Sequence, residues 1–298
     1  MGKKRTAVHD VLDAADYRQL LDTAARLDDR EKAITTFYLL IVLGRVGLRV
    51  GEALHMTDEW YSRERQVIDI PPHMPCNCSL CEHYAEQADD ASLDDYWRAK
   101  YGQGRTAYVY TEQQRDAIER YFEELPYTGM SYSTANRRVT LAAELTGTVN
   151  AARTYPHALR ATAATHLAWS DVLPAALDVQ FGWQNPQTRR AYIEQTGLMA
   201  RRQIDKAVGR EPDIPTMIRR DPPTFTELRE RDDAVEPDTW TPSTSVESHP
   251  RGRDPEEQLE LDNFTADADP RATATATGAM VMMVCYLLLS TVVASFVL

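Results

Sequence analysis

Two arginines, a histidine and a tyrosine are placed along the first two thirds of this 298-residue chain so that they could act together on a phosphate group. Arg49 and Arg160 carry guanidinium groups that keep their charge and can each bind two phosphate oxygens. His157 stands three residues before Arg160, so the two share a face if this stretch is helical. Tyr192 has a hydroxyl with an ordinary pKa of about 10, which becomes a nucleophile once a base removes its proton.

A helix that begins at Pro156 is expected to position His157 and Arg160. Proline is favoured in the first turn of a helix, where its missing N–H costs nothing. Apolar residues recur behind it at helical spacing and predict a buried stripe, namely Leu159, Ala163, Ala164, Leu167 and Ala168. The spacing therefore predicts that the side chains of His157 and Arg160 lie next to a buried apolar stripe of the same helix. His166, within this stripe, is predicted to be a packing histidine and not a ligand.

Three sequence boxes, taken in order, resemble the catalytic core of the tyrosine recombinases, the phage integrase family. They are the Gly-Leu-Arg turn at Arg49 with Glu52 three residues on, the HALR sequence from His157 to Arg160, and the FGW sequence ending at Trp183, nine residues before Tyr192. Taken alone, Arg49 reads as a surface arginine with a helical partner. Chance matches in a helical domain are the alternative, but the HALR box, the FGW box and Tyr192 follow in order at the family's separations and favour the resemblance.

The resemblance implies a phosphoryl transfer from DNA to a protein hydroxyl. Tyr192 would attack a DNA phosphodiester, giving a 3′-phosphotyrosyl link and a free 5′-hydroxyl, and the covalent intermediate makes cofactors unnecessary for rejoining. Arg49 and Arg160 would stabilise the charge of the transition state. His157 would take the tyrosine proton, and the indole N–H of Trp183 would donate a hydrogen bond to the phosphate.

The family also carries a catalytic lysine on a β-hairpin between its two arginine boxes. Lys100 matches in place, because two β-rich runs flank residues 102–104 (Gly-Gln-Gly) and predict a hairpin turn there. Its expected role is to protonate the leaving 5′-oxygen; an ordinary surface lysine is the alternative. Residues 66–70 alternate and predict a short strand that ends at the two prolines after it.

Three cysteines lie close together at Cys76, Cys78 and Cys81, with His83 and His73 nearby. Three thiolates and one imidazole can close a tetrahedral zinc site, and His83 is the expected fourth ligand, with His73 as the second candidate. A fully ligated zinc has no open position, so its role would be structural. A cluster of reduced loop thiols without metal is the alternative.

Helical spacing elsewhere predicts helices over residues 13–28, 30–46, 112–124, 134–146 and 197–208. The second of these is apolar on all sides but charged at both ends, which favours a core helix over a membrane span. The expected fold is mainly α with a small antiparallel β-sheet or hairpin, as in the recombinase catalytic domain. That domain is expected over residues 1–209, without the family's separate N-terminal DNA-clamping domain.

The end of the chain changes character. Residues 210–277 are rich in proline and acidic residues and predict a disordered linker. Residues 278–298 are uncharged and long enough to cross a hydrocarbon core of ~30 Å as a helix. The sequence opens without a secretory signal, and three clustered cysteines are no disulfide framework. We therefore expect a tail-anchored membrane protein with a cytoplasmic catalytic domain.

The formal net charge is −12, which is unusual for a DNA-binding protein. Most of the excess negative charge lies in residues 210–271, so the catalytic part is nearly balanced and can still present a basic face. The few lysines and many aspartates resemble proteins of salt-adapted archaea. The sequence thus predicts a site-specific recombinase or integrase that acts on double-stranded DNA as a homo-oligomer. The alternatives are a membrane-tethered DNA-binding protein with a vestigial site and a type IB topoisomerase.

Overall fold

Helices make up most of the residues that the computed structural model describes, which are 7–76, 78, 81, 96–125, 130–185, 187–189, 197–210 and 222–231. The chain divides into two units, residues 1–240 and 241–298, and every described residue belongs to the first. The helices are α1 (Ala14–Ala25), α2 (Arg30–Ile41), α3 (Val50–His55), α5 (Glu112–Glu124), α6 (Tyr132–Thr146), α7 (Pro156–Trp169), α8 (Pro174–Phe181), α10 (Gly197–Ala207) and α11 (Phe225–Arg229). Short 3-10 or π turns are η1 (Ala7–Asp10), η2 (Val42–Val46), η3 (Asp58–Trp60), η5 (Lys100–Gly102) and η6 (Ala151–Arg153).

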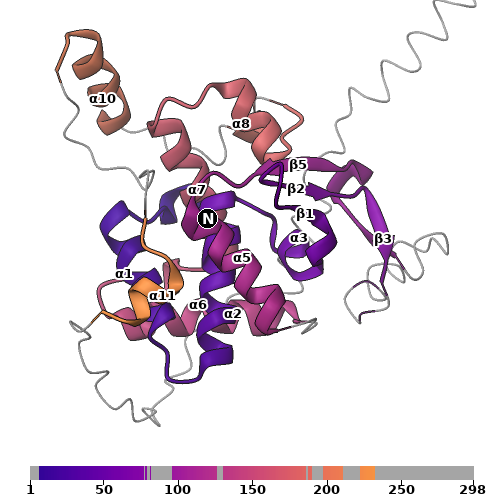
Figure 1. Ribbon diagram of the computed structural model, residues 1–298. Helices are drawn as coiled ribbons and strands as arrows, with labels where there is room; N and C mark the ends of the chain where they lie inside the picture. The colour runs from indigo at the N-terminus through magenta and orange to yellow at the C-terminus, as the bar shows by residue number, and fades with distance from the viewer. Residues whose placement is uncertain are drawn as a thin grey trace, which may run out of the picture. The chain divides into compact units, whose positions relative to one another are not determined.

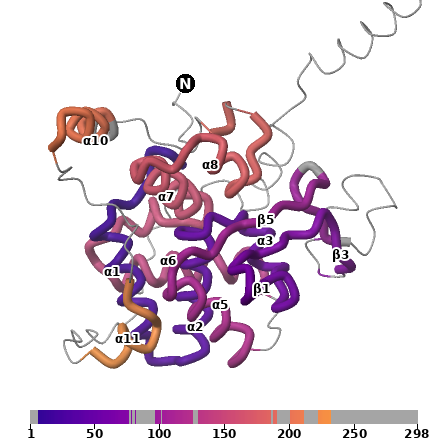
Figure 2. The backbone as a smooth tube through the Cα atoms, turned by 45° about the horizontal axis from the view of Figure 1, so that its top comes forward, coloured from indigo at the N-terminus to yellow at the C-terminus, as the bar shows by residue number. Residues whose placement is uncertain are grey.

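Helix α2 forms the centre of this unit and packs against α1, α5 and α6 (Figures 1 and 2). All its residues from Ala33 to Ile41 are buried, as a helix that is apolar on every side requires. The prediction of a core helix here is confirmed. Tyr38 of α2 stacks on Tyr121 of α5 with ring centroids 3.9 Å apart, and its hydroxyl donates to the Ala53 carbonyl of α3 at 3.0 Å.

The turn that follows α2 brings the first two arginine boxes together. Helix α2 continues into η2, a π-helical turn that ends at Gly47 with a φ of +80°. A Cβ at Gly47 would collide with the Phe181 ring, so only glycine permits this left-handed turn beside α8. Helix α7 packs against η2, which places the start of α3 next to the helix that carries Arg160.

Among the described residues, five short strands form two small antiparallel sheets, in agreement with the predicted α+β class. The strands are β1 (Tyr61–Ser62), β2 (Val67–Ile70), β3 (His73–Pro75), β4 (Tyr96–Arg98) and β5 (Arg105–Tyr108). The first sheet has the order β1-β2-β5 and the second pairs β3 with β4. Strand β2 confirms the strand predicted over residues 66–70.

The predicted hairpin turn at residues 102–104 is wrong. The strands on its two sides do not pair with each other, because β5 pairs with β2 and β4 pairs with β3. The segment β2–β3 runs antiparallel to the segment β4–β5, so the four strands form one long hairpin that is interrupted in the middle. At the interruption, residues 99–104 form a bulge opposite Pro71 and Pro72. Proline lacks the N–H that would continue the ladder, so the strand pairing breaks there. Lys100 lies on this bulge, in η5.

An ordered segment lies inside the stretch whose composition predicts a linker. Residues 222–231 contain α11, which packs against α1 and α5. Phe225 is buried with its ring edge-on to Phe37 at 5.4 Å between centroids. Arg229 donates to the Ala25 carbonyl at 2.8 Å. The composition of residues 210–277 did not reveal α11, because five helical residues change the average over 68 residues very little.

Several predictions fall on residues outside the described ranges, namely Tyr192, His83, most of the linker and the proposed span over residues 278–298. In the part of the chain that the structure describes, no helix is both long and apolar enough to cross a membrane.

Candidate active site and metal cluster

Arg160 occupies the centre of the candidate active site. It is held in α7, and only 2% of its surface is exposed. Its guanidinium donates to the Gly47 carbonyl and, at 2.6 Å from Nη2, to the Phe181 carbonyl. The same group lies over the Phe181 ring, 5.2 Å from its centroid. The three sequence boxes therefore meet around this side chain.

Arg49 lies at the start of α3 and is held by the carboxylate of Glu52. Glu52 accepts from the Arg49 side chain at 2.8 Å and from its backbone N–H at 2.7 Å. The other end of the guanidinium donates to the Gly182 carbonyl at 3.0 Å. Arg49 is thus oriented from two sides while a fifth of its side chain stays exposed to solvent.

A third arginine, Arg105, joins this cluster and was not predicted. It begins β5, and its guanidinium donates to Glu52 at 2.6 and 3.2 Å and to the Gln180 carbonyl. Burial alone would raise the pKa of the Glu52 carboxyl, but the charges of Arg105 and Arg49 outweigh it and hold that pKa far below its usual range. The sequence feature that could have indicated Arg105 is its position directly after Gly104, five residues beyond Lys100.

The FGW box contacts both arginines through its backbone carbonyls. Gly182 is left-handed, with a φ of +59°, and a Cβ there would collide with Arg105 and approach Arg49. The glycine therefore lets the chain pass close to both guanidinium groups. Trp183 follows, buried, with its ring stacked on Phe181 at 4.7 Å between centroids.

The remaining predicted residues lie on elements that border this cluster. His157 lies in the first turn of α7, partly exposed, one turn before Arg160. The Lys100 bulge is tied to the segment after Trp183, because Gln184 donates to Gln103 at 2.7 Å. Tyr192 lies outside the described residues, so its position relative to the arginines stays a prediction.

His166 is a packing histidine, as predicted. It is 1% exposed, and its Nε2 lies 2.8 Å from the Leu12 carbonyl. Burial lowers its pKa to about 4, which keeps the ring neutral at physiological pH.

The arrangement is suited to an anion. Two guanidinium groups, those of Arg49 and Arg160, come from distant parts of the chain and lie close together. Among the side chains of Arg49, Arg105, Arg160 and Glu52 there are three guanidinium groups and one carboxylate, which pairs with Arg49 and Arg105. The cluster thus keeps a net positive charge in a largely buried setting, where electrostatic attraction is stronger than in water.

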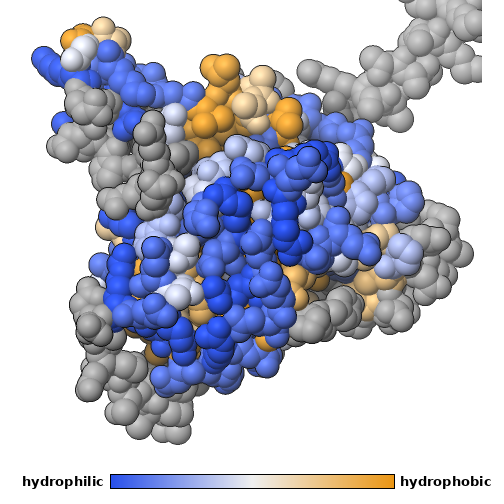
Figure 3. Space-filling view, in the orientation of Figure 1, coloured by the Kyte–Doolittle hydropathy of each residue, from blue (hydrophilic) through white to orange (hydrophobic). Residues whose placement is uncertain are grey.

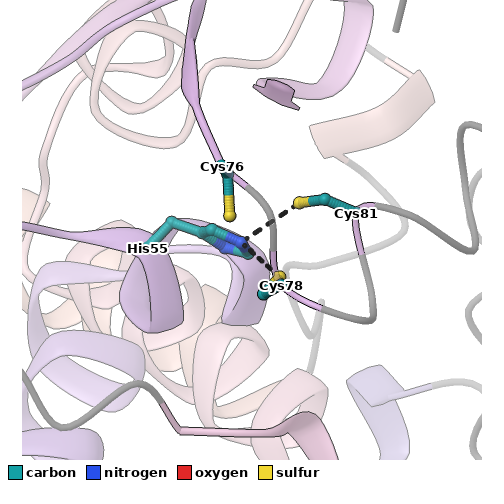
Figure 4. A group of neighbouring side chains, drawn as sticks. All are labelled: His55, Cys76, Cys78 and Cys81. Carbon is teal, nitrogen blue, oxygen red and sulfur yellow. Dashed lines mark hydrogen bonds between the residues drawn. The ribbon is translucent and has the colours of Figure 1, made fainter. Parts of the chain in front are cut away.

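A second cluster contains His55, Cys76, Cys78 and Cys81 (Figure 4). The ligand atoms all lie within 4.8 Å of one another, and His55 Nε2 is 3.4 Å from the sulfur of Cys78 and 3.3 Å from that of Cys81. The three predicted cysteines therefore do come together.

The histidine beside the cysteines is not one that the sequence singled out. His55 ends α3, 21 residues before the first cysteine. His73, the second candidate, lies exposed on β3 and outside the cluster, and the expected ligand His83 lies outside the described residues. His55 carried no signal in the sequence because it is distant along the chain and reaches the cysteines only through the fold.

Comparison with known proteins gives one family and several similar folds. The model of the phage integrase family matches residues 10–197, while no curated protein matches the chain. The Tn1549 transposon integrase in complex with circular intermediate DNA is 20% identical, with a TM-score of 0.48, and 65% of this chain covers 64% of it. XerA recombinase is 15% identical, with a TM-score of 0.49 and coverage of 67% and 65%.

A third solved structure, XerH recombinase bound to a palindromic difH substrate, is 13% identical, with a TM-score of 0.48 and coverage of 67% of this chain and 52% of that one. This chain therefore spans about two thirds or less of the length of these proteins. The family assignment rests on the match over residues 10–197, which include every residue of the arginine cluster. The chain belongs to the phage integrase family.

Proposed function

We propose that this protein is a tyrosine-type site-specific recombinase, which cleaves double-stranded DNA and rejoins it through a 3′-phosphotyrosyl intermediate on Tyr192. The observation that carries the proposal is the meeting of Arg49 and Arg160 around the carbonyls of Gly47, Phe181 and Gly182. Residues more than a hundred positions apart share one anion-binding neighbourhood, as phosphoryl transfer requires.

The arginines would act on the phosphate. Negative charge accumulates on the non-bridging oxygens as phosphorus becomes five-coordinate, and preorganised cations stabilise that state more than the ground state. Arg49 is oriented by Glu52 and by the Gly182 carbonyl, so its direction is set before DNA arrives. Arg160 is fixed by two carbonyls in the same way.

Proton transfer would fall to the residues at the border of the cluster. His157 is the proposed base for the Tyr192 hydroxyl, and Lys100 is the proposed acid for the leaving 5′-oxygen. Trp183 would position the phosphate through its indole N–H. Phosphotyrosine chemistry needs no cofactor, because the protein–DNA bond stores the energy for rejoining.

Assembly of several copies on DNA belongs to the same proposal. Leu173 and Val179, at the start and within α8, are 72% and 65% exposed, and a hydrophobic patch covers this helix (Figure 3). Large apolar side chains in such a patch support a protein–protein contact.

We also propose that residues 278–298 hold the protein at a membrane with the catalytic domain in the cytoplasm. The support is the uncharged, apolar sequence of this segment. Tethering raises the local concentration of a weakly binding domain near one surface.

A suicide DNA substrate, whose cleavage releases a short strand that cannot return, tests the reaction. The wild-type chain should accumulate a covalent protein–DNA adduct, and Tyr192→Phe should form none while binding the same DNA nearly as well. Tyr132→Phe, on α6, is the matched control and should leave the adduct yield unchanged.

The outcomes separate the alternatives. An undiminished adduct with Tyr192→Phe would remove the nucleophile assignment, and DNA binding without any adduct in the wild type would favour a vestigial site. Relaxation of any supercoiled plasmid, without a target sequence, would favour a type IB topoisomerase. Light scattering on Tyr192→Phe bound to DNA measures the number of copies in the complex.

A further inference from the structure

We propose that His55, Cys76, Cys78 and Cys81 bind one zinc ion, which joins the end of α3 to the arm formed by β3 and β4. The four ligand atoms come from two parts of the chain and lie within 4.8 Å of one another. The proposal does not depend on the recombinase reaction, because the site is separate from the arginine cluster.

The distances agree with a tetrahedral site. Zinc lies about 2.3 Å from a thiolate sulfur and about 2.0 Å from an imidazole nitrogen, so sulfur and nitrogen ligands of one ion are roughly 3.5 Å apart. His55 Nε2 lies 3.4 Å from Cys78 Sγ and 3.3 Å from Cys81 Sγ. A central ion therefore fits between these atoms with only small movements.

The imidazole of His55 is prepared to be a ligand. Its Nδ1 lies 2.8 Å from the Gly51 carbonyl, which can only accept, so Nδ1 carries the proton and Nε2 presents its lone pair to the cysteines. A hydrogen bond from the second ring nitrogen to a carbonyl is the usual way in which a metal-binding histidine is oriented. Trp97 stacks on the ring at 5.4 Å between centroids and holds its plane.

The chemistry of the donor set selects the metal. Three thiolates are soft ligands and one imidazole is borderline, a combination that suits zinc and does not suit magnesium or calcium. Four protein ligands fill a tetrahedral site and leave no open position, so the ion would be structural.

The position of the site gives its role. His55 is the last residue of the helix that begins beside Arg49, and Cys76 directly follows β3. Strand β3 pairs with β4, which leads into the Lys100 bulge. One ion would therefore fix the arm that carries Lys100 to the helix that positions Arg49.

Metal analysis of the purified full-length protein, prepared without chelators, is the direct test. Zinc should be present at about one ion per chain. Removal of the ion with a strong chelator should make three additional thiols reactive toward a thiol-titrating reagent and should lower the melting temperature. Protein that is folded but contains no zinc, and does not bind added zinc, would overturn the proposal.

Histidine variants identify the fourth ligand. His55→Ala should lose most of the zinc, whereas His73→Ala, on the exposed face of β3, and His83→Ala should keep it. Full zinc in His55→Ala together with loss in His83→Ala would refute the assignment of His55. If His55→Ala does not fold, cobalt-loaded wild-type protein decides: a tetrahedral absorption spectrum with thiolate charge-transfer bands supports the site, and an octahedral spectrum without them rejects it.

Discussion

Glu52 is the residue on which the geometry of the arginine cluster depends. It is 2% exposed and binds Arg49 on one side and Arg105 on the other. Without its carboxylate, two guanidinium groups would lie side by side in a buried setting with no anion between them. A buried charge that loses its partner is costly, because it can neither return to water nor be neutralised.

Glu52→Gln should therefore lower the free energy of unfolding by about 3 kcal/mol or more, measured by urea denaturation at neutral pH. Arg63→Ala is the matched control, because Arg63 pairs with Asp58 at the surface, where such pairs contribute about 0–1 kcal/mol. The wild-type advantage over Glu52→Gln should shrink at acidic pH. The folded protein holds the pKa of Glu52 below its ordinary value of 4.5, so its stabilisation is present above that value and is lost as the pH falls. An equal loss of stability in both variants would contradict this account.

Sequence reasoning found the residues that stand in recognisable patterns and missed those that only folding brings near. Arg49, Arg160 and Trp183 were marked by their boxes, and the structure places them together. Arg105 and His55 carry no local pattern. Their partners lie 53 and 21 or more residues away in sequence, and such distances become contacts only through the path of the hairpin.

The long interrupted hairpin is the element that shapes the site. Its inner part, β2 with β5, carries Arg105 to the cluster, and its outer part, β3 with β4, leads to the cysteines. Alternating residues and the prolines after them predicted where strand β2 lies. They did not predict which strands pair with each other. Glycine between two strands occurs both in hairpin turns and in bulges, and only the pairing register of the strands distinguishes the two.

Helix α11 contributes stability from inside a stretch predicted to be disordered. Phe225 fills the space between Phe37 and the Arg120 guanidinium, which lies 5.2 Å from its ring centroid. Phe225→Ala should lower the free energy of unfolding by about 3–5 kcal/mol, because it leaves a cavity against the core helix. Glu230→Ala, exposed at the end of the same helix, should change it by about 0.5 kcal/mol or less. Equal effects in a thermal or urea unfolding series would show that α11 does not belong to the cooperative core.

At the scale of the whole molecule, charge and hydrophobicity are divided between the parts of the chain. Residues 1–209 carry 25 basic and 28 acidic side chains and are nearly balanced, whereas residues 210–271 carry 8 basic and 17 acidic side chains. An uncharged apolar run follows. A net charge of −12 opposes DNA binding at a distance, so in the proposed function the association with DNA would depend on the local basic site and weaken with salt.

Removal of the apolar run tests the proposed membrane attachment. Full-length protein should sediment with membranes and require detergent for release, whereas a chain stopped at residue 271 should stay in the supernatant. The truncated chain retains every described residue, so its adduct formation on suicide DNA is the control for intact folding. Equal solubility of the two chains without detergent would rule the attachment out.

The contact between α11 and α1 also governs when the protein can finish folding during its synthesis. Arg26 of α1 donates to the Leu228 carbonyl at 3.1 Å, across 202 positions of sequence. At the usual rate of about 5–20 residues per second, roughly 10–40 seconds pass before the ribosome supplies this partner. Until then the Phe37 face of the core is uncovered. Until α11 emerges, the nascent chain therefore exposes apolar surface of the kind that favours aggregation.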